Sequence, residues 1–99
     1  MRAVQLFSVG RHCTQAHIAQ LWHDWQPQMN PQVSLWLVDL SELQQIDTAG
    51  VLLINALAAQ AESHQCELCF KAPLDMALPD WALVLLNRSL WRDDASAAA

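Results

Sequence analysis

The residues from Val33 to Leu40 form an almost uninterrupted apolar segment, V-S-L-W-L-V-D-L, rich in branched and aromatic side chains. Such a segment is typical of a central β-strand that is buried on both faces of a sheet. After a short polar connection at residues 41–46, the strongest helical pattern of the chain extends from Thr48 to about Ser63. A doubly buried strand that leads into a helix indicates an α/β fold, because parallel strands are joined by helices that cover the sheet.

Strands and helices alternate along the rest of the chain. We expect strands at residues 3–9 and 66–71, a first helix capped by Thr14 and ended by Pro27, and a last helix at residues 78–90. The resulting β-α-β-α-β-α order predicts a mixed, largely parallel sheet of three to four strands with right-handed connections. We expect a single domain over residues 1–92 and a disordered tail over residues 93–99.

The apolar side chains of the predicted helices define the expected core. Asp47 or Thr48 is the expected N-cap of the helix at 48–63. The apolar face of that helix is formed by Val51, Leu52, Ile54, Leu57, Ala58 and Ala61. Four tryptophans are assigned to the core, namely Trp22, Trp25, Trp36 and Trp81, and Trp91 is left open between core and surface.

Composition and charge exclude several classes of function. The formal net charge is −5 and the five Lys and Arg residues are scattered, so we expect neither nucleic-acid binding nor attraction to anionic lipid. No segment has the length of a membrane span and none has the pattern of a signal peptide. The odd count of three cysteines favours reduced thiols, and we therefore expect a cytoplasmic protein.

Enzyme and metal chemistry have little support in the sequence. Cys66 and Cys69 form a C-x-x-C pair, but they lie within a predicted strand, where residues three apart point to opposite faces. His12, Cys13 and His17 have no regular ligand spacing, and no second pair of ligands accompanies them. We find no catalytic constellation and no glycine-rich phosphate loop, and we expect no catalytic residue, no metal and no cofactor.

The most informative residues surround the junction between the buried strand and the helix. They are Asp39, Ser41, Asp47, Thr48, Ala49 and Gly50. In open α/β sheets, ligands and partners bind where strands end and helices begin. Gly50 costs helix stability by about 1 kcal/mol relative to alanine, which is easier to explain if another backbone must approach closely.

These residues resemble the STAS family, the bacterial anti-sigma-factor antagonists and their relatives. In that family a buried strand ends in Asp-Leu-Ser, here Asp39-Leu40-Ser41, and Asp-Ser/Thr-small-Gly then opens a helix, here Asp47-Thr48-Ala49-Gly50. The resemblance covers residues 33–72. It implies a non-enzymatic adaptor or regulatory domain that binds another protein through the start of this helix.

Two departures from the family pattern narrow this interpretation. The phosphorylated hydroxyl of the antagonists directly precedes the glycine, and that position is Ala49 here. The chain therefore looks more like the MlaB-like branch, which implies that Thr48 contacts the ATPase subunit of a lipid-asymmetry ABC transporter. The alternative is an anti-sigma-factor antagonist that binds a kinase-like anti-sigma protein. The family also usually has two strands before its first helix, whereas only one fits into residues 1–10.

The sequence leaves the modification of Thr48 and the oligomeric state open. A phosphate on Thr48 would be favoured by the helix N-terminus, but the adjacent Asp47 would repel it, as would Asp39 if the fold brings it close. We therefore expect Thr48 to act as an unmodified contact and cap. A homodimer, a first strand supplied by another chain, and binding of a nucleotide or lipid all stay open.

Overall fold

The sheet is centred on β3 (Leu35–Asp39), the strand that the apolar segment predicts. In the computed structural model, which describes residues 4–30, 32–71 and 78–86, β3 lies between β1 (Val4–Ser8) and β5 (Glu67–Phe70). Both neighbours pair with β3 in the parallel direction, with Val4 opposite Leu35 and Leu35 opposite Glu67. The chain is therefore an α/β protein with a parallel three-stranded sheet, as the sequence predicts.

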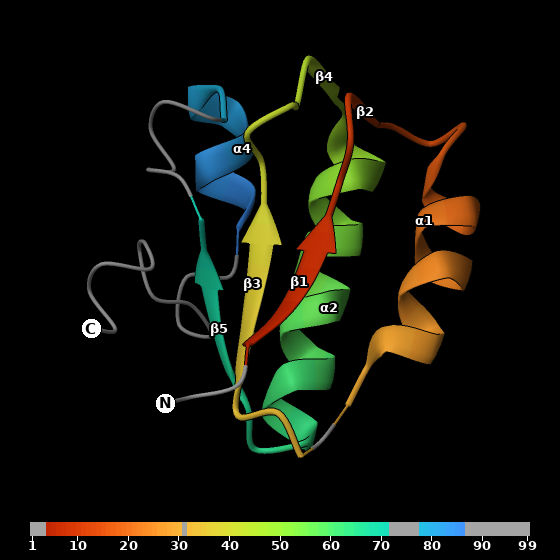
Figure 1. Cartoon of the computed structure of the whole chain (residues 1–99). Helices are drawn as coiled ribbons and strands as arrows, with labels where there is room; N and C mark the ends of the chain where they lie inside the picture. The colour runs from red at the N-terminus through yellow and green to blue at the C-terminus, as the bar shows by residue number, and fades with distance from the viewer. Residues whose placement is uncertain (1–3, 31, 72–77, 87–99) are drawn as a thin grey trace.

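Two helices lie side by side on one face of this sheet (Figure 1). They are α1 (Ile18–Trp25), which continues into the 3-10 turn η1 (Gln26–Gln28), and α2 (Thr48–Ser63). A third helix, α4 (Asp80–Leu85), packs against α2. Among the described residues, the side chains buried between sheet and helices are apolar and include Phe7, Trp25, Trp36, Val38, Ile54, Leu57, Leu68 and Phe70.

Two short strands lie outside the main sheet and correct the sequence-based order. β2 (His12–Cys13) pairs in parallel with β4 (Gln45–Ile46). A second strand therefore precedes α1, and the polar connection at residues 41–46 contains a strand. The described order is β1-β2-α1-β3-β4-α2-β5-α4. β2 does not join the main sheet, so β1 is an edge strand of that sheet. Pairing of two residues with two has no detectable hydrophobic period, which is why the sequence pattern missed it.

Three predictions about helix ends and faces were wrong. α1 begins after His17 with no side-chain cap, because the Thr14 hydroxyl lies 2.8 Å from the His17 ring and not at a backbone N–H. Leu52 is 58% exposed, and Leu53 is buried in its place. The last helix begins at Asp80 with Pro79 as its N-cap, and not at residue 78 as expected.

The tryptophans follow the predictions except at one position. Trp25 and Trp36 are buried and Trp22 packs against the core. Trp81 is 43% exposed, so its assignment to the core was wrong. Ala82 of α4 and Leu86, its C-cap, are buried in the core and Leu83 packs against it, whereas Trp81 is turned toward the surface. Trp91 and the predicted tail at 93–99 lie outside the described residues.

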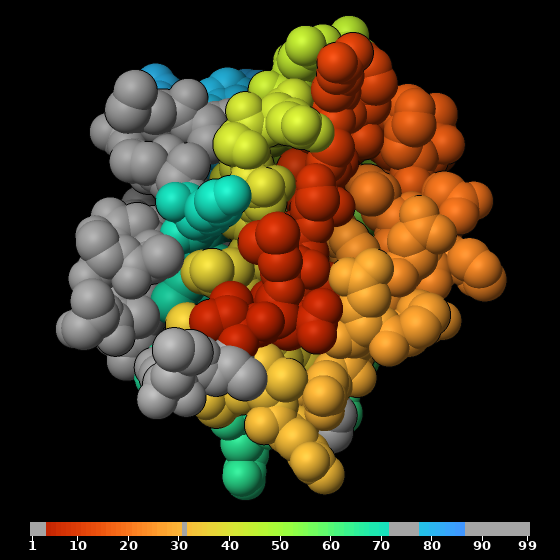
Figure 2. Space-filling view, viewed as in Figure 1, coloured from red at the N-terminus to blue at the C-terminus, as the bar shows by residue number. Residues whose placement is uncertain are grey.

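The opposite face of the sheet carries apolar side chains at the surface. The alternation of β1 sends Phe7 inward and leaves Val4 at 46% and Leu6 at 43% exposure. Figure 2 shows atoms of β1 and β3 on the face turned to the viewer. No helix among the described residues is both long and apolar enough to cross a lipid bilayer.

Candidate functional site

The start of α2 is organised by the side chain of Asp47. Its Oδ1 accepts a hydrogen bond from the backbone N–H of Gly50 at 2.9 Å, so Asp47 and not Thr48 is the N-cap. Its Oδ2 accepts another from the N–H of Gln15, also at 2.9 Å. These two bonds, with that from Gln15 the larger effect, hold the pKa of Asp47 below its ordinary value. Asp47 thus ties the segment before α1 to the start of α2 and uses both oxygens within the chain.

Gly50 is buried because the backbone of β2 passes directly over it. A Cβ built at this position would lie 1.9 Å from the carbonyl oxygen of Cys13 and 3.0 Å from the Ile46 side chain. The close backbone that the sequence predicted is therefore part of the same chain. The backbone N–H of Asp47 donates to the same Cys13 carbonyl, at 3.3 Å. Gly50 therefore serves the internal packing of α2 against β2.

Thr48 is the first residue of α2 and its side chain is exposed. Within the described part of the chain, its hydroxyl has no hydrogen-bond partner. Ala49, the next residue, is half-buried. Thr48 is therefore neither a core residue nor a cap, and of the four residues Asp47 to Gly50 it alone presents a hydroxyl outward.

Asp39 and Ser41 form a separate group at the carboxyl end of β3. Asp39 Oδ1 accepts a 2.9 Å hydrogen bond from the backbone N–H of Ser41, which closes a local turn. Its Oδ2 lies 3.7 Å from Lys71 Nζ, at the end of β5. Hydrogen bonds from Ser41, followed by the charge of Lys71, keep the pKa of Asp39 below its ordinary value. The structure thus divides the six predicted site residues into two groups, each held by different partners.

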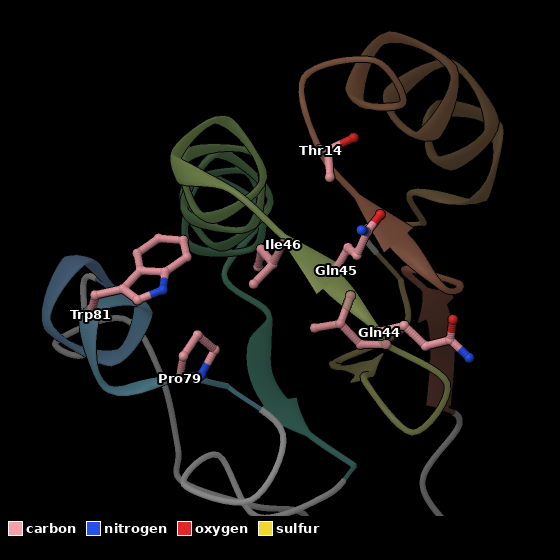
Figure 3. Close-up of a pocket in the computed structure, with 7 residues that line it drawn as sticks. Thr14, Gln44, Gln45, Ile46, Pro79 and Trp81 are labelled. Atoms are coloured by element: carbon pink, nitrogen blue, oxygen red, sulfur yellow. The ribbon is translucent and has the colours of Figure 1, made fainter.

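A hollow of about 560 Å³ lies beside the start of α2, and the sequence did not predict it. Figure 3 shows Pro79 and Trp81 on one side, Gln44 and Gln45 on the other, and Ile46 between them. Its lining residues are Thr14, Leu43, Gln44, Gln45, Ile46, Pro79 and Trp81. A tryptophan at position 81 was the available signal in the sequence, but it was assigned to the core, and only the tertiary structure brings β4 and α4 together.

The cysteines and the histidines of the segment before α1 do not form a metal or redox site in the part of the chain that the structure describes. All three cysteines are free thiols; Cys13 and Cys69 are buried and Cys66 is half-buried. His12 and His17 stack at 5.3 Å between ring centroids, and His12 Nδ1 lies 2.9 Å from Gln45 Oε1. Across residues 4–30, 32–71 and 78–86, no group of three or more His, Cys, Asp or Glu side chains could hold a metal ion.

Comparison with known families identifies the fold. The chain matches the family model described as "Mlab, STAS domain" over residues 4–81. This range includes the buried strand β3 and the Asp-Thr-Ala-Gly segment at the start of α2. The chain belongs to this family of STAS domains. Neither the curated proteins nor the solved structures contain a significant match.

Membership of the family gives the general role of the chain. STAS domains are regulatory or adaptor modules that bind other proteins, and they are generally not enzymes. The arrangement around Thr48 is consistent with such a module, because an exposed hydroxyl on a rigidly anchored helix start can contact a partner without any loop movement.

Proposed function

We propose that this chain is a cytoplasmic adaptor that binds the ATPase subunit of a phospholipid-trafficking ABC transporter through the first turn of α2. The family match to MlaB-like STAS domains and the form of the Asp-Thr-Ala-Gly segment support this partner. The observation that carries the proposal is the exposed Thr48 hydroxyl, which has no hydrogen-bond partner among the described residues, beside an Asp47 carboxylate whose two oxygens both accept hydrogen bonds from within the chain.

The mechanism we propose is docking with differential affinity. Two internal hydrogen bonds to Asp47 and the backbone contact at Gly50 fix the start of α2 before any partner arrives. A preorganised surface loses little conformational entropy on binding. If it binds one conformation of the ATPase subunit better than another, it shifts that subunit toward the bound conformation by the difference in affinity.

The test is binding of the purified domain to the ATPase subunit of the transporter from the same genome. Thr48→Arg and Thr48→Glu should each abolish capture of the subunit while leaving the circular dichroism spectrum unchanged. The two charges act oppositely on the helix N-terminus, by about 0.3–1 kcal/mol each, so a loss common to both variants cannot come from helix stability.

The matched control is Ser63, the exposed last residue of the same helix. Ser63→Arg and Ser63→Glu introduce the same side chains at the opposite end of α2 and should bind like the wild type. Full binding by both Thr48 variants would refute the proposal, as would a wild-type domain that does not bind the subunit.

An anti-sigma-factor antagonist is the second candidate, and one observation favours it. An exposed hydroxyl at the N-terminus of a helix is a position where a phosphate is stabilised by free N–H groups and the helix dipole. Intact mass of the protein purified from its native host distinguishes the two. A stoichiometric gain of one phosphate at Thr48 would favour the antagonist, and an unmodified mass would favour the adaptor.

A further inference from the structure

The hollow beside the start of α2 has the features of a binding groove for an apolar side chain. We call its lining residues, Thr14, Leu43, Gln44, Gln45, Ile46, Pro79 and Trp81, the Trp81 groove. Trp81 is 43% exposed although its neighbour Ala82 is fully buried, so the indole is held at the surface by a helix anchored in the core. Tryptophan on a rigid support is enriched at protein interfaces, where a large apolar area is buried at little entropic cost.

The Trp81 groove is continuous with the surface that carries Thr48. Ile46 lines the groove and directly precedes Asp47, the cap of α2. Leu52 follows Thr48 by four residues, which places both on the same side of the helix, and it is 58% exposed. α2 and α4 are joined next to this surface by a 3.0 Å hydrogen bond from Asn55 Nδ2 to the Leu85 carbonyl.

Acidic residues neighbour the lining of the groove in the sequence. Three carboxylates are each adjacent in the chain to a lining residue, namely Glu42, Asp47 and Asp80, and the first and last of these are exposed. Among the described residues, one basic residue is hydrogen-bonded to the lining of the groove. It is Arg11, whose backbone carbonyl accepts hydrogen bonds from the N–H groups of Gln44 and Gln45. Because the whole chain carries a formal charge of −5, a basic partner surface is complementary to this rim.

We propose that the Trp81 groove receives an apolar side chain from a segment of the ATPase subunit in which lysine or arginine flanks that side chain. This inference rests on the proposed function and extends its docking surface from Thr48 to α4. A second copy of the chain fits less well. A symmetric dimer would bring the same patch together with itself and would set Glu42 and Asp80 against like charges.

Two pairs of variants test the groove against matched controls. Trp81→Ala removes the indole, and Val84→Ala shortens an 82% exposed side chain on the same helix that does not line the groove. Trp81→Ala should raise the Kd for the ATPase subunit by at least about tenfold, as expected for a central tryptophan, and Val84→Ala should leave it within about twofold. Thermal unfolding of each variant separates lost binding from lost folding, and Trp81→Phe should restore part of the affinity.

The charge prediction uses two exposed glutamates. Glu42→Lys should raise the Kd by about three- to fivefold at low salt, with a smaller effect as salt screens the rim. Glu62→Lys, near the other end of α2, makes the same change away from the groove and should have no effect.

The outcomes separate the two proposals. Loss of binding with Thr48→Arg but full binding with Trp81→Ala and Glu42→Lys would overturn the groove and leave the proposed function standing. A wild-type domain that does not bind the ATPase subunit would overturn both. If light scattering showed a wild-type dimer that Trp81→Ala converts to monomer without changing the Kd for the subunit, the groove would be a self-association surface and the inference would be wrong.

Discussion

Asp47 and Gly50 belong to the segment that indicates a binding site, yet Gly50 is buried and both carboxylate oxygens of Asp47 accept hydrogen bonds from within the domain. Asp47 gives one carboxylate oxygen to α2 and the other to the segment before α1. Gly50 allows the Cys13 carbonyl to approach where any side chain would collide. Their role is to fix the position of Thr48, the one member of the segment that presents a hydroxyl to solvent.

Gly50→Ala should destabilise the domain although alanine is the better helix former. The favourable change in helix propensity is about 1 kcal/mol, but a Cβ at 1.9 Å from the Cys13 oxygen forces the backbones apart, and overpacking of this kind costs about 1–3 kcal/mol. Urea unfolding should therefore show a net loss of stability. As a control, Ala56→Gly at an exposed position of the same helix should also destabilise the domain, because glycine is the poorer helix former there. Of these two positions, glycine is then preferred at position 50 alone. A Gly50→Ala variant more stable than the wild type would contradict the close approach.

Asp47 should make stability depend on acid. Hydrogen bonds to the carboxylate lower the pKa of Asp47 in the folded state, so its contribution is complete above the unfolded pKa of about 4 and is lost as the pH falls through the lower, folded value. Asp47→Asn keeps a capping oxygen and removes the charge. The stability difference between wild type and this variant should therefore be larger at pH 7 than at pH 3, measured by urea unfolding. Equal differences at both pH values would show that the charge is irrelevant.

At the scale of elements, α2 connects the core to the candidate site. Its inner face, with Val51, Ile54 and Leu57, is fully buried, and its first turn is fixed by contacts to β2 and to the segment before α1. α4 is a short helix and depends on α2 for its position. The docking surface that we propose therefore consists of the first turn of the long helix α2 and of the short helix α4, which packs against α2.

Asn55→Ala should loosen α4 without unfolding the domain. The hydrogen bond from Asn55 to the Leu85 carbonyl crosses between the two helices, and a bond of this kind contributes about 1 kcal/mol. Amide hydrogen exchange should become roughly fivefold faster in α4, while amides of the buried face of α2 keep their protection. Gln60→Ala, a polar truncation elsewhere on α2, should leave α4 unchanged. Unaltered exchange in the Asn55 variant would show that apolar packing alone holds α4.

At the scale of the whole molecule, one apolar core unites the sheet with its helices. Phe7 from β1, Trp36 from β3 and Phe70 from β5 are fully buried against the helical layer. Cys13, at the edge of this core, is also fully buried, and its Sγ faces the Gly50 carbonyl at 3.7 Å. The start of α2 therefore packs against residues of the core, and its structure is lost when the whole domain unfolds.

Alkylation of Cys13 should report global unfolding. Burial, followed by the charge of Asp47, raises the pKa of Cys13 to about 11, so at pH 8 only about one thiol in a thousand is ionised. Iodoacetamide should modify the half-buried Cys66 first and Cys13 only as fast as the domain opens, which peptide mass mapping can follow. Addition of urea should remove the difference. Equal rates for Cys13 and Cys66 in native buffer would contradict the packing around β2.

The sequence determined the elements whose patterns are long enough to read. β3 and α2 each repeat a hydrophobic signal over many residues, and their order requires a parallel sheet with helices against it. The resemblance of two short motifs to the STAS pattern, Asp39-Leu40-Ser41 and Asp47-Thr48-Ala49-Gly50, led to the family and to Thr48. The acidic composition and the spacing of the potential ligands likewise excluded nucleic acid and metal from the sequence-based hypothesis.

Only the tertiary structure decided how the residues of the site divide between packing and surface. β2 and β4 are two residues each and exist because they pair with one another, 33 positions apart in the chain. The same long-range contacts turn Gly50 inward and engage both oxygens of Asp47, and the anchoring of α4 by Ala82 and Leu86 leaves Trp81 beside Ile46. Local patterns record the preferences of neighbouring residues, whereas these roles depend on which distant segments come into contact.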